Sequence, residues 1–241
     1  MDKKIGLSGQ VSNSGLRTIK NYDASEGTVY YGRALQKVIS KEIGSELLKA
    51  SDGKFLGISV RNEASSKENY SQGHSVPVMK MGSIYVEVEE SVTPDDPVYA
   101  RFDGKLQIQT ITFDADFVAS NKINGFSVSE VSFDTDHATT ISALATALKN
   151  LSEISDCTAS GRVLTITGSV KGLNVEISNI VVSGGASQAG SAVAETVKGI
   201  ALAELGKFRK DSDGTTAVEL TGVKFSENSV DGLVELDVNI I

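Results

Sequence analysis

Residue types on which many functional sites depend are nearly missing from this chain. Its 241 residues include one Cys, two His, three Pro and no Trp. A single Cys cannot form an internal disulfide, and one Cys with two His does not supply the four ligands of a structural zinc site. We therefore expect no metal site and no cofactor. A chain of this length can bury a core large enough to be stable without either.

Long apolar runs and an excess of positive charge are absent too. No stretch of about 18 apolar residues occurs, and the polar residues 1–6 lead into no apolar segment, so we expect no membrane span and no signal peptide. Lys and Arg number 23 against 31 Asp and Glu, a formal net charge of −8. An acidic chain lacks the electrostatic footprint of a nucleic-acid binder. We expect neither a nucleic acid nor a membrane as partner.

The candidate catalytic residues do not form a recognisable constellation. The acidic pairs Glu89–Glu90 and Asp95–Asp96, and also Asp134 with Asp136, fall at predicted turns or strand ends, where turn and capping roles are favoured over acid–base chemistry. Cys157 lies in a predicted strand and is expected to be a small buried side chain. No nucleophile elbow, phosphate loop or dinucleotide fingerprint is present. We predict that the protein is not an enzyme.

Charge is distributed unevenly along the chain. Residues 1–80 hold 12 basic and 8 acidic residues, a net +4, whereas residues 81–241 hold 11 and 23, a net −12. Residues 1–28 are rich in Ser, Asn and Gly and predict an extended N-terminal arm, either a solvated tail or a segment that orders against a partner. A basic arm can bind an acidic partner surface. Its basic residues are Lys3, Lys4, Arg17 and Lys20.

Short strands dominate residues 29–111 and 199–241. Residues 75–88 predict two strands that meet near Met81–Gly82, and residues 232–240 alternate with the period of two typical of a half-buried strand. The segment Thr93–Asp96 is typical of a type I turn, with Pro94 at its second position. Two weaker patterns suggest a helix over Ala34–Leu48, although Gly44 and β-branched residues interrupt it, and a strand over Gly199–Lys207.

Residues 112–198 differ from the rest because they contain no Tyr and no Pro. Asn124–Gly125 and Ser160–Gly161 each predict a hairpin between two strands. Between the hairpins, apolar residues from Ile141 to Leu151 share one face of a helix predicted from His137, with an N-cap among residues 134–136. A further strand is predicted over Asn174–Val182. The order β-β-α-β-β-β predicts a small, compact α+β unit.

Residues 52–102 resemble the structural cement proteins, or capsid decoration proteins, of tailed bacteriophages. The resemblance rests on eight short segments. Five lie before the insert, namely Gly57–Val60, Val76–Val78, Gly82–Val86, Glu89–Glu90 and Pro94–Tyr99. Three lie near the C-terminus, namely Gly206–Phe208, Gly222–Phe225 and Leu233–Val238. It covers about half of the chain, residues 29–111 and 199–241. The insert 112–198 departs from the family pattern and is similar to a small α+β domain found in phage tail and sheath-like proteins.

The resemblance implies a mainly β fold, with a jelly-roll-like or β-barrel body that is built from residues on both sides of the inserted α+β domain. It also implies a non-enzymatic virion protein that is made in the bacterial cytoplasm and stabilises the capsid lattice. It implies a homotrimer whose partner is the major capsid protein, with the insert as an outward knob. We expect the arm and the strand-turn-strand region to contact the coat; the candidate residues are Lys3, Lys4, Arg17, Lys20, Glu89, Glu90, Asp95, Asp96 and Tyr99. The alternatives are a phage tail-tube or baseplate protein and a host-surface or glycan-binding module.

Overall fold

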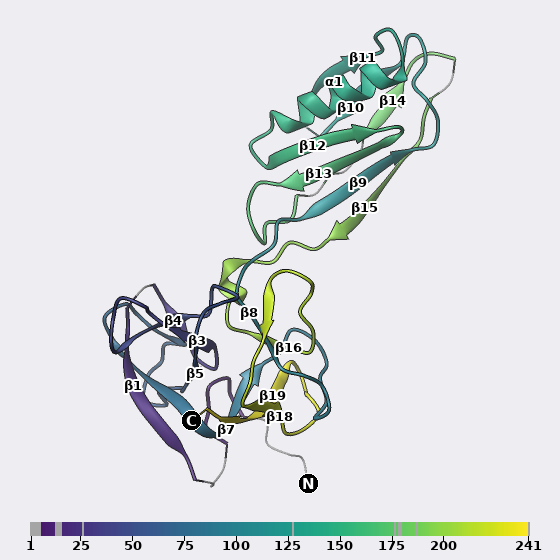
Figure 1. Ribbon diagram of the computed structural model, residues 1–241. Helices are drawn as coiled ribbons and strands as arrows, with labels where there is room; N and C mark the ends of the chain where they lie inside the picture. The colour runs from purple at the N-terminus through teal and green to yellow at the C-terminus, as the bar shows by residue number, and fades with distance from the viewer. Residues whose placement is uncertain are drawn as a thin grey trace. The chain divides into compact units, whose positions relative to one another are not determined.

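The chain divides into two compact units. The computed structural model describes residues 6–12, 16–25, 27–126, 128–175, 177, 180–186 and 188–240. Unit 1 comprises Met1–Asp103 and Ala203–Ile241, and unit 2 comprises Gly104–Leu202 (Figure 1). The sequence of unit 2 is thus inserted into that of unit 1, and its ends lie at residues 104 and 202. The insert predicted from the sequence, residues 112–198, is slightly shorter.

Five strands of unit 1 close into a β-barrel. They are β1 (Thr18–Ala24), β3 (Ala34–Lys37), β4 (Gly44–Leu47), β5 (Phe55–Ser59) and β7 (Ser75–Glu87). Their order is β1-β4-β3-β5-β7, and β7 pairs back with β1 to complete the ring. Apolar side chains such as Leu35, Val76 and Val78 are fully buried in one cluster. The expected mainly β fold with a barrel body is confirmed. The described residues also form several small sheets and one α-helix.

The longest strand, β7, connects the barrel to a second set of strands. Its first half pairs with β1 and β5, and its second half pairs with β19 (Leu233–Asn239), which pairs with β18 (Val223–Phe225). Gly82 lies where the partners change and has a φ of +125°, a conformation that favours glycine. The expected pair of strands meeting near Met81–Gly82 is corrected to one continuous strand.

Two predicted elements of unit 1 are wrong. Ala34–Leu48 is not a helix but contains β3 and β4, with a turn between them. The β-branched residues and Gly44 disfavour a helix there, and pairing with neighbouring strands outweighs the weak local preference. The segment Gly199–Lys207 is not a strand, since it contains the 3₁₀ helix η1 (Leu202–Glu204).

The expected N-terminal arm, residues 1–28, is part of the body wherever the structure describes it. Residues 18–24 form barrel strand β1, so their backbone hydrogen bonds are made within the chain. Val11 forms an antiparallel bridge with Ile84 of β7, and the amide of Gly9 donates to the carbonyl of Tyr85 at 2.7 Å. The predicted arm is therefore not a separate extension. Its described residues around Gly9 and Val11 lie beside β7, and Thr18–Ala24 is a barrel strand.

Two small sheets complete unit 1. One has the order β16-β8-β17, and the other pairs β2 with β6; their bounds are β2 (Val29–Tyr30), β6 (Asn69–Tyr70), β8 (Tyr99–Arg101), β16 (Phe208–Arg209) and β17 (Ala217–Glu219). Strand β8 thus lies between two segments that follow unit 2 in the sequence. The largest core cluster of unit 1 draws on both sides of the insert, because it joins Ile84 and Val86 to Phe208 and Leu236.

Unit 2 contains two antiparallel sheets and the helix. The four-stranded sheet has the order β12-β13-β9-β15, with β9 (Ile108–Phe113), β12 (Ile154–Ser160), β13 (Val163–Gly168) and β15 (Ser191–Val197). The three-stranded sheet has the order β11-β10-β14, with β10 (Lys122–Gly125), β11 (Val128–Ser132) and β14 (Val181–Ser183). Both predicted hairpins, β10–β11 and β12–β13, are confirmed. The strand expected over Asn174–Val182 is shorter and begins only at Val181.

Helix α1 (His137–Lys149) is the one α-helix of the described residues. Its predicted apolar face is confirmed, since Ile141, Leu144 and Leu148 are buried against the sheets. The side chain of Asp136 is the N-cap and accepts a hydrogen bond from the Thr139 amide at 2.7 Å. The core of unit 2 consists only of residues of unit 2, from Ile111 to Ala189.

Candidate functional site

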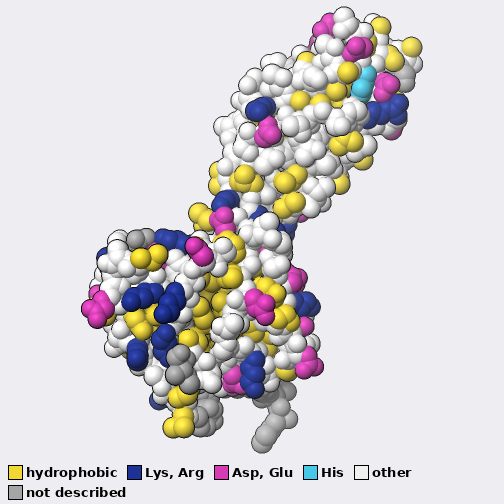
Figure 2. All heavy atoms as spheres, in the orientation of Figure 1, with side chains coloured by type: hydrophobic (Ala, Val, Ile, Leu, Met, Phe, Trp, Pro, Cys, Tyr) yellow, Lys and Arg dark blue, Asp and Glu magenta, His cyan; other side chains and the backbone are white. Residues whose placement is uncertain are grey.

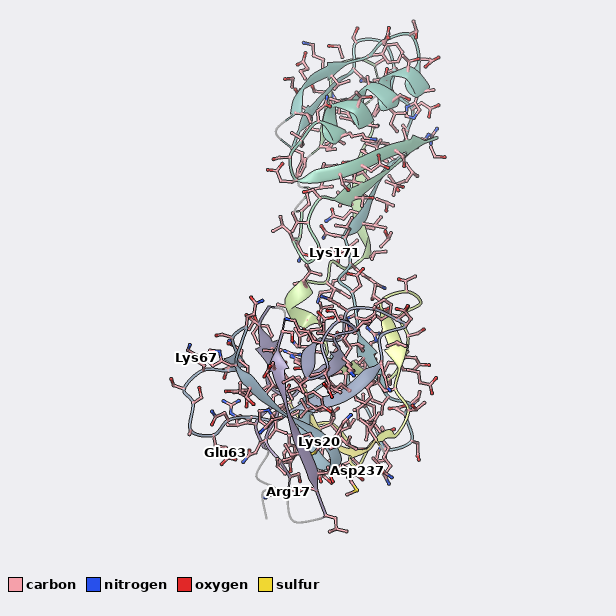
Figure 3. All side chains as sticks on the ribbon, turned by 60° about the vertical axis from the view of Figure 1, so that its left-hand side comes forward. Arg17, Lys20, Glu63, Lys67, Lys171 and Asp237 are labelled. Carbon is pink, nitrogen blue, oxygen red and sulfur yellow. The ribbon has the colours of Figure 1, made fainter. Side chains whose placement is uncertain are left out.

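Basic side chains gather on the outside of the barrel. We define the lysine face as Lys20 of β1, Lys37 of β3, Lys54 just before β5 and Lys80 of β7. Lys and Arg side chains cluster over the part of unit 1 where Figure 1 draws β1, β3 and β5 (Figure 2). Figure 3 shows Lys20 on β1, with Arg17 near the start of that strand. Of the predicted contact residues, Lys20 belongs to the lysine face, and Arg17 is exposed three positions before it in the sequence.

Strand pairing brings these lysines together. Lys20 is opposite Val78 in the β1–β7 pairing, two residues from Lys80. The amide of Lys37 donates to the carbonyl of Lys54 at 3.1 Å, so those two residues are neighbours on adjacent strands. The barrel therefore collects lysines that lie up to 60 positions apart in the sequence.

Electrostatic repulsion within the lysine face is visible at Lys80. Its ammonium donates a hydrogen bond to the carbonyl of Leu56. Burial lowers the pKa of Lys80, and the positive charges of Lys20 and Lys54 lower it further. No ion pair with a described carboxylate offsets these charges at Lys20, Lys54 or Lys80. An acidic surface placed against this face would relieve the repulsion.

The acidic candidate Glu89 has an internal role instead. Both of its carboxylate oxygens accept from the guanidinium of Arg101, whose side chain is 0% exposed, and Nη2 of Arg101 lies 2.6 Å from Oε2 of Glu89. Arg101 also pairs with Asp213 at 2.9 Å, and Arg209 pairs with Glu89 at 2.9 Å. Burial alone would lower the pKa of Arg101, but hydrogen bonds to Glu89 and Asp213 outweigh it and raise the pKa. Glu89 is thus unavailable to a partner.

The other acidic candidates form local contacts near the same small sheet. Glu90 accepts from the amide of Lys210 at 3.1 Å. Asp96 closes the predicted turn by accepting from the Thr93 amide at 2.7 Å, and Asp95 is exposed in that turn. The hydroxyl of Tyr99 lies 3.4 Å from the Glu219 carboxylate, and burial followed by the charge of Glu219 raises the pKa of Tyr99. Lys3 and Lys4 lie outside the described residues.

Sequence reasoning missed most of the residues that the structure singles out. Lys37, Lys54 and Lys80 were unmarked because each stands alone in its own segment, although Lys80 is a polar residue within an apolar strand. The partners of Glu89 were missed because Arg101 and Asp213 are more than 100 positions apart and meet only through the small sheet.

The described residues offer little that could support catalysis or hold a metal. Among them, no group of three or more His, Cys, Asp or Glu side chains is arranged to hold a metal ion. Burial raises the pKa of Cys157 to about 11, which makes its thiol a poor nucleophile. Nδ1 of His137 accepts from the Phe117 amide at 2.9 Å, so that ring links α1 to a preceding loop. In the part of the chain covered by the structure, no helix is long and apolar enough to cross a membrane.

The chain is similar to proteins of bacteriophages. A family model described as "Structural cement protein (E217 gp24/Pam3 gp6)" matches residues 1–155 of the chain. No curated protein matches. A chain in a structure described as the capsid of Myoviridae phage XM1 is 12% identical with a TM-score of 0.49; the alignment covers 99% of this chain and 94% of that one. A chain from Mycobacterium phage Patience is 16% identical with a TM-score of 0.37, at the same coverage.

Proposed function

Because the chain belongs to the phage structural cement protein family, we propose that it binds the major capsid protein through the lysine face and does so as a homotrimer. The protein is a structural component of the phage capsid and not an enzyme. The observation that carries the proposal is the group of unneutralised lysines on the barrel of a chain whose net charge is −8. A basic face on an acidic protein orients it toward an acidic partner.

Cementing in this proposal is a matter of contact area and charge. A protein that bridges neighbouring coat subunits stabilises the lattice by surface that it buries on both of them. The barrel supplies a rigid platform for the lysine face, since its strands are hydrogen-bonded around the whole ring.

A closed homotrimer matches a three-fold position of a lattice, which supports the proposed trimer. The mass of the free protein in solution tests that state, and a monomer at all concentrations would remove it.

The lysine face is tested by reversing its charge. We expect Lys20→Glu with Lys54→Glu to weaken binding to undecorated capsids about 10-fold or more at low salt, because attraction becomes repulsion at two positions. The loss should shrink as salt is added, since salt screens exposed charges. The measurement is the bound fraction in a capsid pull-down over a range of protein concentrations.

A matched control separates the face from total charge. Lys198 is an exposed lysine of unit 2, and Lys198→Glu changes the net charge by as much as Lys20→Glu or Lys54→Glu alone, without touching the barrel. It is therefore compared with each of these single variants. This variant should bind as the unaltered protein does. Equal weakening by both sets of variants, or no weakening by either, would contradict the proposed role of the lysine face.

The tail-tube or baseplate alternative is not supported by the family match. A tail protein would appear as density on the tail in electron microscopy of purified particles. We expect density over the head in particles that contain this protein, and no such density in particles that lack it.

A further inference from the structure

Barrel strand β1 has one edge with no partner strand over most of its length. Strand β4 pairs only with the last two residues of β1, whereas β7 pairs with the first six. We define the free edge as the side of Thr18–Tyr22 that faces away from β7; the described residues place no strand beside it. Ile19, Lys20 and Asn21 are exposed there. Figure 3 draws β1 at the front of unit 1, with Lys20 on it.

The backbone groups of Ile19 and Asn21 point out of the free edge. Successive residues of a strand direct their amides and carbonyls to opposite sides. At the end of β1, the amide of Ala24 donates to the carbonyl that precedes β7 at 2.8 Å, and the amide of Asp23 donates to the carbonyl that precedes β4 at 2.7 Å. Two and four positions before Asp23, Asn21 and Ile19 therefore face the side of β4, whose pairing does not extend to them.

Strand β7 supports the same assignment. Pro77, which is opposite Asn21, has no amide hydrogen. Its carbonyl accepts from the amide of Val60, just after β5, at 2.8 Å. Within the described residues, the amide and carbonyl of Asn21 thus have no backbone partner. An exposed edge of this kind is a template on which a strand of another molecule can pair.

The charges beside the free edge indicate what kind of strand fits. Lys20 is part of the edge, and Lys54 and Lys80 of the lysine face belong to other strands of the same barrel. The carboxylates of Asp23 and Glu42 lie where β4 begins, beyond the end of the free edge. A strand with acidic side chains would be attracted to the lysines while its backbone pairs with β1.

We propose that an extended acidic segment of the major capsid protein adds to the free edge of β1 as a further strand. The proposal rests on the proposed function and specifies how the lysine face is engaged. Backbone hydrogen bonds to Ile19 and Asn21 set the register of the segment. Because side chains alternate along a strand, every second residue lies on the face of Lys20 and is acidic. The residues between them lie beside Ile19, which is 38% exposed, and are apolar.

Replacing Asn21 tests strand addition. Asn21→Pro removes an amide hydrogen that β7 does not use, and proline is tolerated where the amide of an edge strand faces solvent. We expect a melting temperature close to that of the unaltered protein and binding to undecorated capsids that is about 10-fold weaker, because one hydrogen bond is lost and the ring crowds the added strand. The weakening should persist at high salt, unlike that of the lysine variants.

Asn21→Ala is the matched control, because it removes the same side chain and keeps the amide. This variant should bind undecorated capsids as the unaltered protein does. Equal weakening of binding by Asn21→Ala and Asn21→Pro would overturn the proposal, and so would unchanged binding by both.

Amide hydrogen exchange of the unaltered protein is a second test that needs no variant. In the free protein, the amides of Lys20 and Tyr22 face β7 and should exchange slowly, whereas those of Ile19 and Asn21 should exchange rapidly. On undecorated capsids, the amides of Ile19 and Asn21 should exchange about 10-fold more slowly or less. Rapid exchange of both amides in the bound protein would overturn strand addition, even if Asn21→Pro fails to fold.

The outcomes separate the free edge from the lysine face. If the lysine variants weaken capsid binding and Asn21→Pro does not, the proposed function stands and strand addition is overturned. If Asn21→Pro weakens self-association in sedimentation and leaves capsid binding unchanged, a second copy of this chain occupies the edge, which also overturns the proposal. Salt-independent weakening of capsid binding by Asn21→Pro alone supports it.

Discussion

Arg101 is the largest fully buried side chain among the described residues, and it is charged. Its guanidinium is held by the carboxylates of Glu89 and Asp213, and by the hydroxyl of Thr216. Arg209 pairs with the same two carboxylates, so two cations and two anions are satisfied together. This network joins segments before and after unit 2 in the sequence. Buried charges of this kind are compatible with a stable fold only while each charged side chain keeps its partner.

Removing Arg101 should therefore be severe. We expect Arg101→Met to lower the free energy of unfolding by about 3–5 kcal/mol, because Glu89 and Asp213 lose a buried partner. Urea denaturation measures this. Arg162→Met removes an ion pair between exposed side chains, with Asp116, and should change stability little. Comparable losses in the two variants would contradict the importance assigned to burial.

Individual elements differ in how far their sequence specifies them. Helix α1 has an N-cap, a continuous apolar face and Lys149 in its last turn, so local sequence and tertiary packing agree. Strands β3 and β4 have no such agreement, and a weak helical pattern yields to pairing with β5 and β1. Strand β7 is continuous because Gly82 accepts the backbone conformation required where the strand changes partner.

The N-cap of α1 predicts a specific pH dependence. The amide of Thr139 donates to Asp136 and lowers the pKa of Asp136. A lowered pKa in the folded state contributes stability that is present above the unfolded-state value of 3.8 and is lost as the pH falls through the folded-state pKa. Asp136→Asn keeps a capping oxygen without this titration, so the melting temperature should fall less between pH 5 and about pH 2.

Asp136→Ala is the companion variant, because it removes the cap altogether. It should melt lower than both other proteins at neutral pH, where the aspartate and asparagine caps are both intact. Calorimetry across the pH range measures all three proteins. An acid transition of the same steepness in Asp136→Asn and in the unaltered protein would show that Asp136 does not contribute.

At the scale of the whole molecule, the two units have separate cores. The larger core cluster of unit 1 contains residues from the segments before and after the insert, and the smaller one contains residues from before it only. The core cluster of unit 2 contains none of these residues. The ends of unit 2 meet, because the amide and carbonyl of Lys105 bond to the carbonyl and amide of Ile200, both at 2.9 Å. Because the chain enters and leaves unit 2 at neighbouring points, the two segments of unit 1 can be joined directly when unit 2 is removed.

Excision of unit 2 should consequently leave unit 1 folded. We expect a chain in which a short Gly-Ser linker joins Asp103 to Ala203 to melt cooperatively and to retain the Arg101 network, whose members all lie in unit 1. Circular dichroism with thermal melting checks this. An unfolded or aggregated product would contradict the independence of the two cores.

The candidate site was only partly predictable from the sequence. A basic N-terminal region was visible as a charge excess, and Arg17 and Lys20 were identified from it. The remaining lysines of the face were not, because the face is assembled across four strands. Glu89 carried the family resemblance but its partners could not be inferred, since ion pairing depends on which segments the small sheet brings together.

Local patterns in the sequence determined the mainly β character, the helix with its cap and both hairpins of unit 2, because each depends on residues within about fifteen positions of one another. The scarcity of Cys, His and Trp likewise indicated a protein that works by contact. Only the tertiary structure decided the closure of the barrel through β1, the course of β7 and the lysine face. Those depend on pairing between distant segments, where burial and hydrogen bonding outweigh local preference.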